Sequence, residues 1–331
     1  MQPKSNQKNV FLVVKLTVAL ISFGYISYIF FRTPDFYIRF LHIWTNKEMY
    51  FHADSLWFAI LLVPINWGIE AYKWKFLASK VENISLKNAY GGVLAGLCLG
   101  FITPHAVGDY AARIYFMHVK HRLRAVGAIL LARISLFYIT LLYGVIGFVI
   151  LFRFTQLDTG FFNLDMLIPI CLFLGIIFVL IFNYELVSNV LTRISLFRKY
   201  IHPYFKIIGN YSTIDLAFTF MLSLLRYAVF TIQYLLILQF FGVNVYDVLV
   251  LASVCMIFFA KSIFPSFNFL NDVGVREAAA LFFLGNIGLE EPIIITASLT
   301  VWVINIFIPA LVGLGVILGA KKNQNIVNLV A

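Results

Sequence analysis

The sequence predicts an all-α protein, a polytopic transmembrane helical bundle made of two inverted repeats that each contain a re-entrant helical hairpin. Of its 331 residues, 62% are hydrophobic and only 12% are charged, whereas soluble domains are about 25% charged. Apolar runs recur without a Ser/Pro/Gly-rich linker, so we expect a single integral membrane domain over residues 1–331. A short motif that occurs twice after a proline indicates the repeats.

Six apolar runs are long enough to cross a bilayer, at about 18 to 28 residues each. They are Val10–Phe31, Asp54–Phe76, Ala125–Phe152, Asp165–Phe182, Ile214–Phe241 and Ile293–Leu318. The first run follows two lysines and lacks a small-residue cleavage site, so we expect an uncleaved span rather than a removed signal peptide. The stretch Val187–Ile208 mixes apolar and basic residues, which predicts an amphipathic helix on the inner leaflet.

Two further apolar stretches, Ala89–Thr103 and Val248–Phe264, are each followed by Pro, Gly and charged residues and then by a second short apolar helix. Basic residues flank both ends of the first stretch, which places both ends in the cytoplasm. The loops around the second stretch are poor in Lys and Arg, so both of its ends are expected outside. We therefore predict two re-entrant hairpins that enter from opposite faces, with both chain termini cytoplasmic, in the plasma (inner) membrane.

The internal repeat is indicated by the hexapeptides 107–112 (VGDYAA) and 273–278 (VGVREA), whose glycines are 166 residues apart. The same shift superposes the flanking spans, which predicts a first repeat near 54–152, a linking span and amphipathic segment at 165–208, and a second repeat near 214–319. An odd number of crossings separates corresponding points, so the second copy is inverted, as in many transporters. The alternative is a duplication kept only for packing.

Candidate binding residues occur where a helix is expected to begin inside the membrane, at Gly108–Asp109 and at Asp272–Gly274. Helix N-termini bind phosphates and carboxylates through unpaired N–H groups and partial positive charge. Arg113 and Arg276 each follow an aspartate by four residues, and they are the first candidates for holding a phosphate. Alternatively, the aspartates are only helix caps and each arginine only neutralises its aspartate.

A polar stripe on the second span is formed by Asn66, Glu70 and Lys73, at helical spacing on an otherwise apolar helix. Such a stripe is expected to face the interior. Glu70 can either accept a proton or pair with Lys73 or a hairpin arginine, and pairing is the preferred interpretation. Arg226, which forms a similar stripe with Gln233, is expected to line the same cavity, and Lys261 is a further candidate phosphate contact.

The sequence contains no pattern typical of a metal site, a cofactor site, an enzyme or a nucleic-acid-binding protein. The cysteines Cys98, Cys171 and Cys255 are far apart in apolar runs, and no His, Cys or carboxylate group has metal-ligand spacing, so we expect no metal site and no cofactor. Motifs of the G-x-S-x-G, P-loop and H-E-x-x-H types are absent, so we do not expect an enzyme. The net charge of +10 is explained by cytoplasmic loops that attract anionic lipid, without nucleic acid.

Three segments carry a family resemblance: residues 66–75 (NWGIEAYKWK), 104–109 (PHAVGD) and 274–279 (GVREAA). With these segments in this order, the chain resembles the lysylphosphatidylglycerol synthase/flippase transmembrane family over nearly its whole length. In members that make lysylphosphatidylglycerol, the membrane part is thought to move the modified lipid between leaflets, while a cytosolic domain transfers the lysine. Because this chain ends soon after its last span, the resemblance implies the translocation half, with a transferase encoded separately as a possible partner.

By residue, the resemblance supports Gly108, Asp109, Gly274, Arg276 and Glu277 as site positions, with Asp109 where many relatives carry Glu. The expected function is binding an anionic phospholipid or lipid-linked headgroup and moving it between leaflets. The main alternative is a membrane enzyme or enzyme subunit that acts on a phospholipid or polyprenyl phosphate, with Asp109 or Glu277 as the base. A third interpretation is a passive scaffold.

Overall fold

The computed structural model describes residues 52–103, 107–115, 117, 122–155, 167–183, 192–193, 206–263 and 274–320. The described residues form helices and contain no strand, which confirms the all-α prediction. The predicted first span, Asp272 and nearly all of the predicted amphipathic segment lie outside these residues.

Four described helical segments are long and apolar enough to cross a membrane, so the chain is a multi-pass membrane protein. They are α3 (Ala53–Ala78), α6 (Arg122–Phe154), α11 (Thr213–Phe240) and the continuous segment made of α14 (Glu291–Trp302), the π-helical turn η6 (Val303–Phe307) and α15 (Ile308–Ala320). These segments coincide with four of the predicted spans. The helix α7 (Leu167–Phe182) lies at a fifth predicted span, and its 16 residues fall short of the roughly 20 that a crossing needs.

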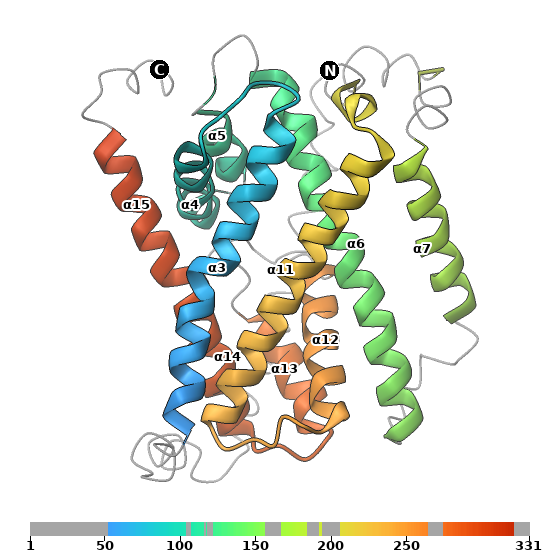
Figure 1. The fold of residues 1–331 in the computed structure, drawn as a ribbon. Helices are drawn as coiled ribbons and strands as arrows, with labels where there is room; N and C mark the ends of the chain where they lie inside the picture. Colours follow the sequence, from blue (N-terminus) through green and yellow to red (C-terminus); the bar gives the residue numbers. More distant parts are fainter. Residues whose placement is uncertain are drawn as a thin grey trace, which may run out of the picture.

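Each predicted hairpin is a pair of shorter helices. The first pair is α4 (Leu86–Ile102) with α5 (Val107–Tyr115), and the second is α12 (Val248–Ile263) with α13 (Val275–Gly285). At 1.5 Å per residue, α5 is about 14 Å long and α13 about 17 Å, well below the roughly 30 Å of a bilayer core. Figure 1 shows the two pairs at opposite ends of the bundle, as expected for hairpins that enter from opposite faces.

The helix starts are fixed by short polar side chains. The hydroxyl of Ser85 accepts a hydrogen bond from the backbone N–H of Asn88 and caps α4. Ser212 and Asp215 form a reciprocal capping box at the start of α11. The carboxylate of Asp215 also pairs with Lys80 at 2.9 Å, which ties the start of α11 to the end of α3.

The packing of the helices follows the same order in both halves. The long helices α3 and α11 pack against each other, α6 packs against the second hairpin through α12, and α15 packs against the first through α4. Gly147 on α6 and Gly313 on α15, which are 166 residues apart, both allow close backbone approach. A Cβ at Gly147 would lie 2.8 Å from the carbonyl oxygen of Ala252, and one at Gly313 would lie 2.0 Å from that of Leu94. This arrangement agrees with the proposed repeat, whose inverted relation stays a prediction.

The π-helical turn η6 forms a joint between α14 and α15. Pro309 lacks an N–H, so the carbonyl of Asn305, four residues earlier, has no α-helical partner. The indole N–H of Trp67 on α3 donates to this carbonyl oxygen at 3.0 Å. Inside a membrane such a carbonyl must be satisfied by the protein, so the Trp67 bond allows the irregular turn.

Replacing Trp67 with Phe removes this donor, and we expect the free energy of unfolding to fall by about 1–3 kcal/mol. The measurement is denaturant titration of the purified protein in detergent micelles. Pro309→Ala gives position 309 an N–H for the same carbonyl, so the Trp67→Phe change is expected to cost less in that background. An equal cost in both backgrounds would show that the indole acts through packing alone.

Candidate functional site

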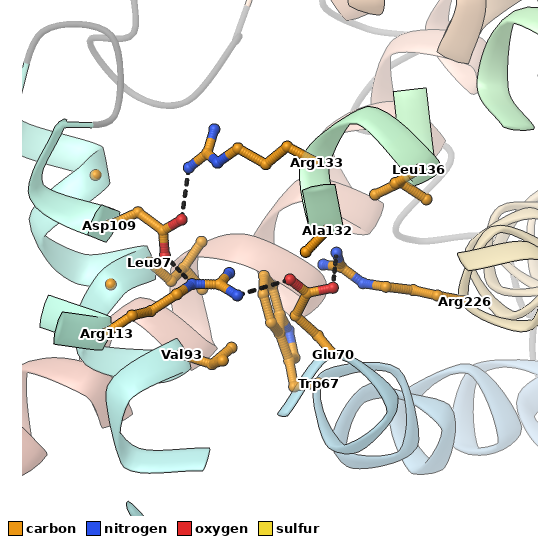
Figure 2. A pocket seen from close by; sticks show the side chains of 12 residues that line it. Trp67, Glu70, Val93, Leu97, Asp109, Arg113, Ala132, Arg133, Leu136 and Arg226 are labelled. Atoms are coloured by element: carbon orange, nitrogen blue, oxygen red, sulfur yellow. Dashed lines mark hydrogen bonds and ion pairs between the residues drawn. The ribbon is translucent and has the colours of Figure 1, made fainter. Parts of the chain in front are cut away.

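The candidate site is a partly open cavity of about 210 Å³ lined by residues of α3, α4, α5, α6 and α11 (Figure 2). Its charged lining residues come from four of these helices, while α4 contributes small and apolar residues. The lining consists of Trp67, Glu70, Val93, Gly96, Leu97, Gly100, Asp109, Arg113, Ala132, Arg133, Leu136 and Arg226. The first hairpin and three long helices therefore meet around a polar space within an apolar bundle.

Glu70 is the central carboxylate of the site, and its side chain is almost fully buried. Its oxygens accept from Arg113 Nη1 at 2.9 Å and from Arg226 Nη1 at 2.8 Å, and Lys73 Nζ lies 3.1 Å from Oε2. Lys73 also donates to Ser223 Oγ and to the carbonyl oxygen of Ala132, both at 3.2 Å. Glu70 thus joins α3, α5 and α11, and the preferred sequence interpretation, pairing with Lys73 and a hairpin arginine, is confirmed.

Asp109 is the second buried carboxylate and lies in the first turn of α5. Its Oδ1 accepts from Arg113 Nε at 2.8 Å, so the predicted pair one helical turn apart is present. Its Oδ2 accepts from Arg133 Nη2 on α6 at 2.5 Å. The side chain lies directly against Gly96 on α4, where an added Cβ would come within 2.2 Å of Oδ1. Only glycine at position 96 leaves room for this carboxylate.

Arg133 is a site residue that the sequence interpretation missed. Its signal was available, because a charged side chain in the middle of the apolar run Ala125–Phe152 marks a functional candidate. The guanidinium lies over the ring of Tyr110, 4.8 Å from the centroid. Its side chain remains 40% exposed, against 7% for Arg113 and 10% for Arg226. Arg133 is therefore the most accessible arginine that lines the cavity.

The two polar stripes predicted on separate spans face each other. Asn66 Nδ2 on α3 donates to Gln233 Oε1 on α11 at 3.1 Å, and Asn66 Oδ1 accepts from Arg226 Nε at 3.1 Å. The Arg226 guanidinium also lies 4.9 Å from the centroid of the Trp67 ring. Arg226 lines the cavity as expected, whereas Gln233 lies outside the lining, where it accepts from Asn66 and donates to the carbonyl oxygen of Ala59 at 3.0 Å.

The charges of the site do not balance. Arg133, Asp109, Arg113, Glu70 and Arg226 alternate in sign and form what we call the ion-pair chain (Figure 2), and Lys73 joins it at Glu70. Among the described residues, four cations against two carboxylates leave an excess of two positive charges. Buried charge is costly unless it is compensated, so the cavity favours an anion.

The second hairpin forms a separate polar cluster, which we call the Arg276–Glu277 cluster. Glu277 Oε1 accepts from both Arg276 and Ser298, and its Oε2 accepts from the backbone N–H of Gly274 at 2.7 Å. Gly274 has φ +103°, a conformation that favours glycine. None of these residues lines the cavity, and neither does Lys261. The predicted candidates therefore divide into two groups rather than converging on one space.

The predicted anion donors at the helix starts already have internal partners. The N–H of Gly108 donates to Thr103 Oγ1 at 2.8 Å, and that of Gly274 donates to Glu277. The side chains around the cavity, rather than these backbone groups, thus offer the available positive charge. Within the described part of the chain, no group of three or more His, Cys, Asp or Glu residues is placed to hold a metal ion.

Replacing Glu70 with Gln removes the carboxylate shared by three cations and leaves them facing one another inside the bundle. We expect the free energy of unfolding to fall by about 3–5 kcal/mol, measured by denaturant titration in micelles. Glu290→Gln is the matched control, because Glu290 is exposed and its side chain makes no cap hydrogen bond. Equal stability of the two variants would contradict the central role of Glu70.

Comparison with known proteins agrees with the geometry. A search of curated proteins and a search of solved structures gave no match. The family model described as "Lysylphosphatidylglycerol synthase TM region" matches residues 45–313. This match contains every described helix that lines the cavity. The chain therefore belongs to the lysylphosphatidylglycerol synthase TM region family.

Proposed function

We propose that the chain binds an anionic phospholipid or lipid-linked headgroup in the cavity and moves it between the leaflets of the membrane. The observation that carries this proposal is the excess of positive charge at the cavity: among the described residues, three arginines and two carboxylates line it, and Lys73 pairs with Glu70 outside the lining. A phosphate would offset this charge, and arginine is the side chain best suited to bind it.

The size of the cavity also supports a headgroup as the ligand. Its volume of about 210 Å³ is below the roughly 300–1,000 Å³ of pockets that enclose a drug-sized molecule. The acyl chains of a lipid would therefore stay outside, against the exposed apolar side chains of the long helices. Exposed apolar side chains are abundant on these helices: Leu61, Met221 and Leu225, for example, are each about half exposed or more.

The rival enzyme function uses Asp109 or Glu277 as a base. Both oxygens of Asp109 accept from arginines, and both oxygens of Glu277 accept hydrogen bonds within its own cluster. Pairing with Arg113 and Arg276 favours the ionised form of each carboxylate and makes it a weaker base, so we favour transport without catalysis by this chain. A cytosolic transferase encoded separately is the proposed partner that would supply the lipid.

We further propose that the protein lies in the plasma (inner) membrane with both termini in the cytoplasm. Lys75 and Lys80 lie at or just beyond the end of α3, and Lys87 lies at the start of α4. Asp247 directly precedes α12, and Glu290 and Glu291 lie at the start of α14. Figure 1 shows the end of α3 at the side of the first hairpin and the starts of α12 and α14 at the opposite side. Basic residues favour the cytoplasmic side. The first hairpin would then open toward the cytoplasm.

Cysteine labelling tests this orientation. In a variant without native cysteines, Lys80→Cys and Tyr246→Cys place single thiols in loops at opposite ends of the bundle, and Tyr246 is 89% exposed. We expect a membrane-impermeant maleimide to label Tyr246→Cys in intact cells and Lys80→Cys only after the membrane is opened. The reverse pattern would invert the proposed topology.

Leaflet-resolved lipid movement in proteoliposomes tests the function itself. We expect the full chain to accelerate movement of a fluorescent phosphatidylglycerol, with a smaller effect on phosphatidylcholine because the cavity favours net negative charge. Arg226→Gln should remove most of the acceleration, whereas Lys87→Gln, at an exposed position outside the cavity lining, should leave it unchanged. Movement no faster than in protein-free liposomes would reject transport, and turnover of the lipid would favour the enzyme.

A further inference from the structure

Arg133, at one end of the ion-pair chain, differs from Arg113 and Arg226 in its hydrogen bonding. Arg113 and Arg226 each make two hydrogen bonds to buried side chains. Within the described part of the chain, Arg133 donates a hydrogen bond to Asp109 alone, and its buried Nε has no hydrogen-bond partner. Because a guanidinium carries five N–H donors, Arg133 retains unused capacity where the cavity is accessible.

Asp109 occupies the position that a ligand anion would be expected to take. It is a carboxylate in the first turn of α5, where negative charge is favoured, and it lies between Arg113 and Arg133 (Figure 2). Its carboxylate lies against Gly96 and is only 8% exposed. Arg133 has the longer side chain and, at 40% exposed, is the more accessible member of this pair.

We propose that Arg133 is the residue that takes up a ligand phosphate, and that it does so by leaving Asp109. This inference rests on the proposed function and names the ligand-contacting residue of that cavity. With the cavity empty, Asp109 holds the guanidinium as an internal counter-ion. A phosphate mono- or diester competes for the same donors and adds contacts to the unpaired Nε, in the bidentate geometry that arginine favours.

The exchange has a structural consequence. The Arg133–Asp109 bond joins α6 to the α4–α5 hairpin, and Arg113 keeps its bond to Glu70 when Arg133 leaves. A bound phosphate would therefore remove this ion pair, while the apolar cluster that contains Ile129 of α6 and Val93 of α4 still holds the two together. Ligand binding would thereby weaken the attachment of the hairpin to α6 without breaking it.

The proposal predicts that substitutions of Asp109 and of Arg133 change the affinity for phosphatidylglycerol in opposite directions. In the full chain in nanodiscs, Asp109→Asn should tighten binding of a short-chain phosphatidylglycerol about five-fold or more, since the competing carboxylate is neutralised. Arg133→Gln should weaken it about ten-fold or more. In the double variant the gain from Asp109→Asn should vanish, because Arg133 is no longer there to be released. Arg153→Gln, at the exposed end of the same helix, is the matched control and should bind as the wild type does.

The outcomes separate this inference from the function on which it rests. Wild-type affinity in Arg133→Gln, or weaker binding in folded Asp109→Asn, would overturn the inference while leaving anionic lipid binding in place. If the wild type binds no phosphatidylglycerol, the inference and the proposed function both fail. A parallel titration with glycerol 3-phosphate distinguishes the source of the phosphate: comparable affinity for it would assign a soluble phosphate, and much weaker affinity a lipid headgroup. Should Asp109→Asn not fold, Arg133→Gln alone decides.

Discussion

A single carboxylate, Glu70, holds the functional half of the bundle together. It is buried and accepts from arginines on α5 and α11 while pairing with Lys73 on its own helix. Because the membrane interior cannot solvate charge, a cation or carboxylate left there without its partner would destabilise the fold. The first hairpin is therefore attached to both central helices by ion pairs in addition to the apolar cluster that α3, α4 and α6 share.

The two hairpins share a backbone plan but differ in chemistry. The 166-residue shift carries Glu70 onto Leu236, Arg113 onto Ala279 and Arg226 onto Ile60. The ion-pair chain consequently has no counterpart in the second half, whose own polar residues close on one another in the Arg276–Glu277 cluster. If the halves are repeats, the site was built on one of them, and Arg276 and Glu277 of the second hairpin pair with each other instead.

The helix that covers the first hairpin is connected to the site through Trp67. Its indole N–H holds the carbonyl released by Pro309, and its ring lies beneath Arg226 at the cavity. The segment beyond the joint, α15, packs on α4 at Gly313, and α4 lines the same cavity. Arg226, Trp67 and the joint thus form a continuous physical connection between the site and the outer helix.

The sequence by itself determined the all-α class, four of the described spans, both short helix pairs and the polar stripes, because apolar length and helical spacing are local properties. It also identified Asn66, Glu70, Lys73, Asp109, Arg113 and Arg226, since charge in an apolar run is conspicuous. Only the tertiary structure decided which of them meet. Arg113 pairs with Glu70 across 43 positions, while Arg276 remains in its own cluster. Which charged residues pair depends on how helices far apart in the sequence pack together, and a local sequence pattern contains no information about that packing.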